Sequence, residues 1–159
     1  MNGETTREYA ARVAQANRSE LVVIIYELFL HALDDAKESL KAGKEEKGCE
    51  YIKRAQGFLQ ELMDSLDHSY EISGRLLRLY RYVNMQLILS VIRKELVQEE
   101  AVREVMTKLK AAFEEVAKQD TSEPLMENTQ QVYAGLTYGK GSLNEVLMSR
   151  DEYNRGYRV

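Results

Sequence analysis

The stretch LLRLYRYVNMQLILSV, residues 76–91, determines the fold class of this chain. Its apolar side chains recur every three or four positions, which is the period of a helix with one buried face and not the alternation of a strand. The stripe that we expect in the core is Leu76, Tyr80, Val83, Leu87 and Val91. The same spacing recurs on both sides of this stretch, so we predict an all-α chain.

Four long helices are expected, at residues 19–42, 47–66, from 69 or 73 to 94 or 96, and 98–118, with a short additional helix at 6–16. Ser19 is the expected N-cap of the first, and Gly43 ends it. The connections are short and polar, which favours antiparallel neighbours. We therefore predict an antiparallel up-down four-helix bundle over residues 1–123, which includes an N-terminal helical arm at 1–18.

The helix-breaking residues lie late in the chain. The only proline is Pro124, and the glycines that follow it are Gly135, Gly139, Gly141 and Gly156. We therefore expect residues 124–159 to form an irregular C-terminal tail. The tail also holds the tyrosines Tyr133, Tyr138, Tyr153 and Tyr157. Two roles stay open for it: docking on the bundle through these rings, and a mobile linker.

Composition excludes several classes of protein. The 159 residues carry 22 Lys and Arg against 26 Asp and Glu, and this net charge of -4 argues against a nucleic-acid partner. One cysteine, Cys49, excludes an internal disulfide and fits a reducing compartment. No run approaches the about 20 apolar residues that cross a bilayer, so no membrane insertion is expected. The first twenty residues are too polar for a signal peptide, which predicts a cytoplasmic protein.

No catalytic, metal or cofactor site emerges from the residues. Neither His31 nor His68 follows a glutamate at the spacing of three residues that di-iron bundles use. The Gly139-Lys140-Gly141-Ser142 run lacks the spacing of a phosphate loop. We therefore expect no metal, no cofactor and no enzyme activity.

The first and third long helices carry more apolar surface than a bundle buries. Residues 21–33 are apolar at almost every position, and the third helix has a second stripe of Tyr82, Met85, Leu89 and Ile92. Such surface must be covered. One interpretation is coverage by the arm, the tail or the partner of a homodimer. The other is a groove for an amphipathic helix of another protein. The two interpretations are compatible, because a mobile segment can cover a groove until a partner displaces it.

Three stretches together resemble one known family. They are SELV at 19–22 with IYE at 25–27, IKRAQ at 52–56 with LQEL at 59–62, and LYRYV at 79–83. In this order and spacing they resemble the flagellin export chaperone family, FliS, over roughly residues 8–119. The chain departs from the family pattern at Arg18, where a proline is usual, and at Phe113, where a tryptophan is often found.

The resemblance implies a bundle without catalysis that binds the disordered C-terminal segment of flagellin. It also implies that the chain prevents premature polymerisation in the cytoplasm and aids delivery to the type III export apparatus, with export-gate components as further partners. Tyr9 matches the family's capping tyrosine, and Val13 is a second candidate of this arm. The alternative is a structural bundle whose stripes form a constitutive oligomer. The groove candidates are Ile24, Ile25, Phe29, Tyr82, Met85 and Leu89. For each of them, packing in the core is the alternative interpretation, because the spacing does not decide which stripe faces inward.

Overall fold

A computed structural model describes residues 3–126, and the side chains of residues 6–126. These residues contain five helices and no strand, so the predicted all-α class is confirmed: α1 (Gly3–Gln15), α2 (Arg18–Lys41), α3 (Glu45–Asp64), α4 (Glu71–Arg93) and α5 (Glu99–Gln119). The chain divides into two compact units after Leu125, and the description below concerns the first. The predictions about the tail's glycines and tyrosines lie outside the described residues.

The start of α2 differs from the prediction by two residues. Asn17, and not Ser19, is the N-cap: its side-chain oxygen accepts a hydrogen bond from the Glu20 amide at 2.9 Å. The Glu20 carboxylate accepts one in return from the Asn17 amide at 3.0 Å, which completes a capping box. Ser19 lies two residues too late for this role, and its hydroxyl donates to Asp120 instead.

The end of α2 follows the expected stop. Gly43 has a φ of 72°, a left-handed conformation that costs little without a side chain. The Gly43 amide donates to Leu40 O, and the Lys44 amide donates to Ser39 O at 2.9 Å, which is the Schellman pattern. The chain therefore reverses sharply between α2 and α3.

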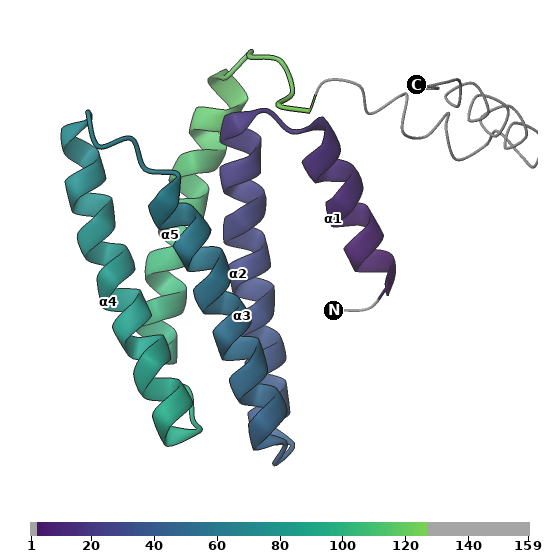
Figure 1. Cartoon of the computed structure of the whole chain (residues 1–159), viewed down its shortest axis with the longest axis vertical. Helices are drawn as coiled ribbons and strands as arrows, with labels where there is room; N and C mark the ends of the chain where they lie inside the picture. The colour runs from purple at the N-terminus through teal and green to yellow at the C-terminus, as the bar shows by residue number, and fades with distance from the viewer. Residues whose placement is uncertain (1–2, 127–159) are drawn as a thin grey trace, which may run out of the picture. The chain divides into compact units, whose positions relative to one another are not determined.

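Helices α2 to α5 lie side by side, and each connection joins neighbouring ends, so successive helices run in alternating directions (Figure 1). We call these four helices the bundle. Helix α2 packs along both α3 and α5, whereas α4 packs mainly along α3 and has little contact with α5. Helices α2 and α4 are therefore diagonal from each other. Helix α1 packs on α2, on the side away from α4 (Figure 1).

The core of the bundle draws on all four of its helices. Its largest fully buried members are Tyr26, Phe29, Leu33, Ile52, Leu59, Leu62, Tyr80, Val83, Leu87, Val102 and Met106. The Tyr26 and Tyr80 hydroxyls hydrogen-bond each other inside this apolar surround. Burial raises the pKa of each phenol, so both stay neutral. The predicted core stripe of α4 is confirmed, since four of its members are buried and Val91 packs against them.

Candidate partner-binding surfaces

The arm, α1, covers an apolar patch on the outer side of α2. Tyr9 and Ala16 of the arm and its connection bury Ile24 to an exposure of 3%. Val13, Leu21 and Leu28 pack around this contact, and together these residues form a small cluster separate from the core. We call Leu21, Ile24 and Leu28 the arm-covered patch. Covering Ile24 in this way contributes about 1.5–3 kcal/mol, so the arm is held far less firmly than the bundle helices.

A polar contact fastens the arm beside this patch. The Arg12 guanidinium donates to both carboxylate oxygens of Glu27, at 2.6 and 3.2 Å, and also lies 5.3 Å from the Tyr9 ring centroid. The Tyr9 ring meets the His31 ring edge-on, with 5.8 Å between centroids. Burial acts to raise the pKa of Glu27, but the hydrogen bond and charge of Arg12 outweigh it, so this pKa is lowered. The arm is thus anchored by an ionised carboxylate.

The segment after α5 ties the arm's connection to the bundle. We call Asp120–Leu125 the strap. Its Asp120 carbonyl accepts from the Asn17 side-chain amide at 3.2 Å, and the Asp120 carboxylate accepts from the Ser19 hydroxyl at 2.5 Å. The Leu125 amide donates to Ala16 O at 3.1 Å. Hydrogen bonds from Ser122 and Ser19 hold the pKa of Asp120 at about 2. The segment after α5 therefore meets the connection between α1 and α2.

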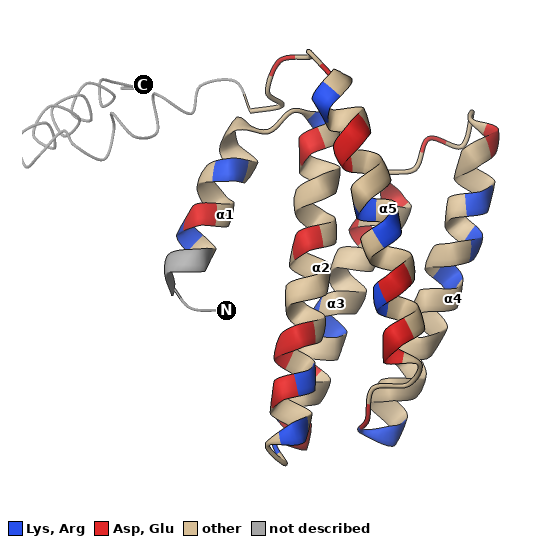
Figure 2. Ribbon diagram, turned by 180° about the vertical axis from the view of Figure 1, so that it is seen from behind, with Lys and Arg blue, Asp and Glu red and all other residues tan. Residues whose placement is uncertain are grey.

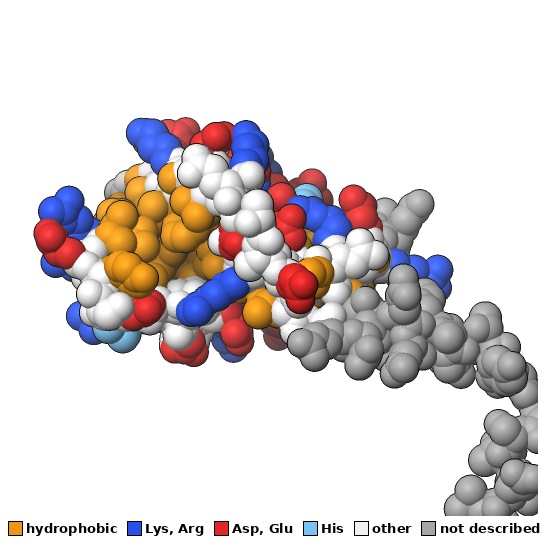
Figure 3. Space-filling view, turned by 90° about the horizontal axis from the view of Figure 1, so that it is seen from above, with side chains coloured by type: hydrophobic (Ala, Val, Ile, Leu, Met, Phe, Trp, Pro, Cys, Tyr) orange, Lys and Arg blue, Asp and Glu red, His pale blue; other side chains and the backbone are white. Residues whose placement is uncertain are grey.

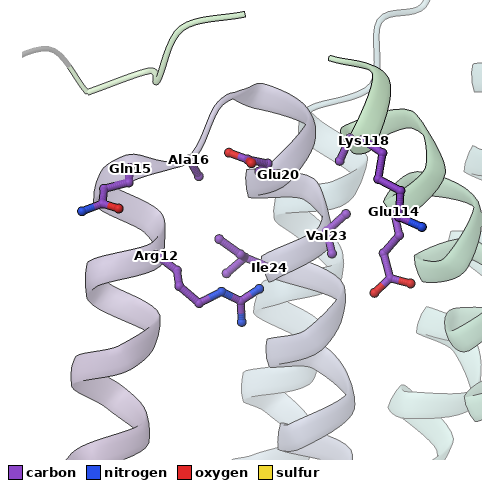
Figure 4. A pocket seen from close by; sticks show the side chains of 9 residues that line it. Arg12, Gln15, Ala16, Glu20, Val23, Ile24, Glu114 and Lys118 are labelled. Carbon is purple, nitrogen blue, oxygen red and sulfur yellow. The ribbon is translucent and has the colours of Figure 1, made fainter. Parts of the chain in front are cut away.

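A cleft of about 630 Å³ opens between the arm and the bundle. Figure 4 shows Ile24 and Val23 of α2 at its floor, with Arg12 reaching across from α1 and with Glu114 and Lys118 on the α5 side. The arm therefore covers the patch without filling the whole space beside it. A displaced arm would leave a longer apolar surface open along α2.

The outer side of α4 is apolar and uncovered. Tyr82 is 41% exposed, Met85 53% and Ile92 71%, and Leu89 between them is half-buried. We call these four residues the α4 face. They follow one another at the three- and four-residue spacing of one helix side. Monomeric proteins seldom leave such a continuous stripe open unless a partner uses it.

A second apolar surface lies at the end of the bundle where α4 begins. Figure 3 looks onto this end and shows hydrophobic side chains gathered in a hollow with charged residues around it. The hollow has a volume of about 300 Å³ and exists because α4 stands away from α5. We call it the end hollow. Its apolar lining is Val22, Leu66, Tyr70, Ile72, Leu76, Tyr80, Phe113 and Val116.

The structure separates the six predicted groove residues into three places. Ile24 lies under the arm, where the predicted capping residues Tyr9 and Val13 also lie. Phe29 is fully buried in the core, and Ile25 packs against that core. Tyr82, Met85 and Leu89 share the α4 face. Because α2 and α4 are diagonal, these side chains do not line one common groove.

Nothing in the sequence pattern singles out the end hollow or the strap. Tyr70 and Val116 line the hollow, but their sequence positions carry no sign that α4 and α5 diverge there. Asp120 lies just after α5, and only its distance from Asn17 in space reveals the strap. Ile92 shares the second apolar stripe of α4 with Tyr82, Met85 and Leu89 but is not among the predicted groove residues, and the structure leaves it 71% exposed beside them.

Other kinds of site are missing from the part of the chain that the structure describes. Between residues 6 and 126, no three His, Cys, Asp or Glu side chains come together as metal ligands. None of the described helices is both long and apolar enough to span a membrane.

The family model described as "Flagellar protein FliS" matches residues 1–120, which include all five helices. This chain belongs to the FliS family. Membership in the FliS family implies a flagellar export chaperone role, with flagellin in general as the partner, and it supports a protein that is not an enzyme. Among curated proteins, no sequence matches this one.

Proposed function

We propose that this FliS-family chain binds the C-terminal segment of flagellin on the apolar surfaces of an antiparallel four-helix bundle, α2–α5. In this proposal the chain acts in the cytoplasm, prevents premature flagellin polymerisation and aids delivery to the type III export apparatus. The observation that carries the proposal is the α4 face, because a FliS-family chain presents there an open apolar stripe of the width of one helix. An amphipathic segment can lay its apolar side on such a stripe.

The energetics fit a reversible complex. Burying four large side chains of the α4 face would contribute about 6–12 kcal/mol, at about 1.5–3 kcal/mol each. Ordering a disordered segment costs roughly 2–5 kcal/mol or more, which leaves an affinity around the micromolar range. Methionine in the middle of the stripe suits a surface that adapts to its ligand. A chaperone that must release its client for export needs an affinity of this order.

The arm has a separate part in the proposal. Tyr9 and Val13 cover Ile24 in the free protein, and a long flagellin segment displaces them to reach the arm-covered patch. Ile25 and Phe29 then lie on the core side of α2, where they support the patch and make no direct contact with the client. Export-gate components would meet the chaperone with its client already bound.

Calorimetric titration with a synthetic peptide of the host flagellin's C-terminal segment tests the proposal. We expect saturable 1:1 binding and the appearance of helix signal in the peptide. The double variant Tyr82→Ser/Met85→Ser should bind at least tenfold more weakly, because truncating central apolar anchors typically costs about 1–2 kcal/mol or more. Both side chains are exposed, so the melting temperature should change little.

Leu125→Ser is the matched control for this variant. Leu125 is 56% exposed, close to the 53% of Met85, and its hydrogen bond in the strap comes from the backbone amide. This control should bind the peptide as the wild type does. Equal losses in both variants would contradict a site on α4. If the wild type does not bind, deletion of residues 1–16 or 127–159 shows whether the chain covers its own surface, and failure of both deletions would refute the proposal.

A constitutive homo-oligomer is the second candidate, and the same α4 face favours it. An uncovered apolar stripe can pack against its copy in a second chain. Light scattering after size exclusion over a wide concentration range separates the two. An oligomer that persists on dilution, and that Tyr82→Ser/Met85→Ser converts to a monomer, would assign the face to self-association.

A further inference from the structure

Helix α4 is basic although the whole chain is acidic. It carries Arg75, Arg78, Arg81 and Arg93 against a single acidic residue, Glu71, while the net charge of the chain is -4. Figure 2 shows these blue positions along α4 and the red one at its start. The helix that presents the open apolar stripe is therefore also the one that attracts negative charge.

The arginines and the apolar residues occupy successive parts of the same helix side. Positions 75, 78, 82, 85, 89 and 92 follow the three- and four-residue steps that bring side chains into line. Arg75 and Arg78 occupy the first part of this line, with Arg81 beside it, and Tyr82, Met85, Leu89 and Ile92 occupy the rest. The α4 face thus continues directly into a basic surface toward the start of the helix.

Most of this positive charge has no counterpart nearby. Arg75 pairs with Glu71 at 3.0 Å, but both side chains are largely exposed, so the pair is weak. Within the described residues, Arg78, Arg81 and Arg93 have no carboxylate at ion-pair distance. Their guanidinium groups are exposed to solvent and available to a partner.

We infer that the α4 face takes an amphipathic helix with carboxylates at one end, over Arg75, Arg78 and Arg81, and apolar anchors at the other. The inference rests on the proposed function, since it specifies the chemistry of the client segment bound there. The apolar half supplies most of the affinity. The arginines set the orientation of the segment and speed its association, because exposed ion pairs add little binding energy but steer encounter.

The arrangement of the charges favours a protein segment over an anionic membrane. A helix that lies on a membrane separates its basic and apolar residues around the helix, onto opposite faces. On α4, by contrast, Arg75, Arg78 and Arg81 precede the apolar residues of the α4 face along the helix, and only Arg93 follows them. Such a surface complements a segment whose own acidic and apolar parts follow each other in sequence.

Two synthetic helical peptides with identical leucine and methionine anchors test the inference. One carries glutamates in the half beyond the anchors, and the other carries lysines at the same positions. We expect the full-length protein to bind the glutamate peptide about tenfold more tightly than the lysine peptide at low salt. This preference should shrink as sodium chloride is raised, because salt screens exposed charges.

Arg78→Glu/Arg81→Glu locates the effect on α4. Both side chains are exposed, so the variant should fold, and it should reverse the preference in favour of the lysine peptide. The control Lys44→Glu/Lys47→Glu makes the same change of charge at the exposed start of α3. It should keep the preference for the glutamate peptide. Tyr82→Ser/Met85→Ser should weaken the binding of both peptides.

Three outcomes would overturn the inference. Equal affinity for the two peptides would show that charge plays no part. An unchanged preference in Arg78→Glu/Arg81→Glu would place the basic site elsewhere. Binding of phosphatidylglycerol vesicles, lost in Arg78→Glu/Arg81→Glu, without binding of either peptide would assign the surface to membranes.

The flagellin peptide separates this inference from the proposed function. If that peptide binds the wild type and Arg78→Glu/Arg81→Glu equally well, the proposed function stands and the charge inference fails. If the glutamate peptide binds on α4 and the flagellin peptide binds nowhere, the chemistry of the face is supported and the flagellin proposal fails.

Discussion

Two glycines of α3 lie in opposite surroundings. At Gly48, an added Cβ would lie 2.6 Å from the Leu40 side chain, because α2 and α3 approach closely there. At Gly57, an added Cβ would meet nothing within 4 Å. Glycine in a helix interior costs roughly 0.5–1 kcal/mol relative to alanine. Only at Gly48 does the missing side chain allow two helices to pack closely.

Gly48→Val should lower the free energy of unfolding by about 1–3 kcal/mol, because Leu40 must move away from the new side chain. Gly57→Ala, a substitution in open space, should raise it by roughly 0.5–1 kcal/mol. Urea unfolding followed by circular dichroism measures both. A Gly48→Val variant as stable as the wild type would show that the contact between α2 and α3 yields easily.

A second prediction concerns the buried pair of Tyr26 and Tyr80. Tyr26→Phe leaves the Tyr80 hydroxyl without its partner in the core and should cost about 1–3 kcal/mol of stability. Tyr26→Phe/Tyr80→Phe removes both hydroxyls together and should cost less than the sum of the single changes. A double-mutant cycle by urea unfolding measures this coupling, expected at about 0.5–3 kcal/mol. Strict additivity would contradict the pairing of the two hydroxyls.

Of the five described helices, α1 is the one whose contacts with the rest of the protein should weaken in acid. The pKa of Glu27 is lowered in the folded state, so its contribution is present above the unfolded pKa, near 4.5, and is lost as pH falls. The pKa of Asp120 in the strap is also lowered, to about 2, so its contribution declines between about pH 4 and pH 2. Acid therefore weakens the contact between Arg12 and Glu27 that holds the arm and, at lower pH, the bond between Asp120 and Ser19 that holds the strap.

Hydrogen exchange of the α1 amides, expressed as protection factors, checks this expectation. Protection at pH 7 should fall about fivefold in acid, the size of a loss of roughly 1 kcal/mol from a well-formed surface ion pair. Glu27→Gln should show reduced protection already at pH 7 and a weaker dependence on pH. Protection of α1 that stays constant down to pH 3 would show that apolar contacts alone hold the arm.

The core side of α4 was predictable from the sequence, and the core side of α2 was not. In α4, Arg75, Arg78 and Arg81 mark the solvent side, so the remaining stripe must face inward. In α2, residues 21–33 are apolar all round because one side meets the core and another meets the arm. Periodicity cannot distinguish these two sides, and Ile24 and Phe29 were therefore grouped together although they face different neighbours.

For the whole molecule, the helix bounds were predictable and the relations between helices were not. Each of the four long helices starts and ends within a few residues of its expected limits, because caps and periodicity are local signals. The looser contact of α4 with α5 and the bond between Asn17 and Asp120 depend on residues far apart in the chain. The end hollow and the strap arise from these contacts between distant residues, so only the structure reveals them.

The strap also has a consequence for the order of events during synthesis. A growing chain emerges from the ribosome with its N-terminal residues first, so α1 appears before α2–α5. The hydrogen bonds that hold its hinge come from Asp120 and Leu125, more than a hundred positions later in the sequence. The arm therefore gains all of its contacts only when translation of the first unit is nearly complete. Until then, the arm lies on the arm-covered patch of α2 without the hydrogen bonds of the strap.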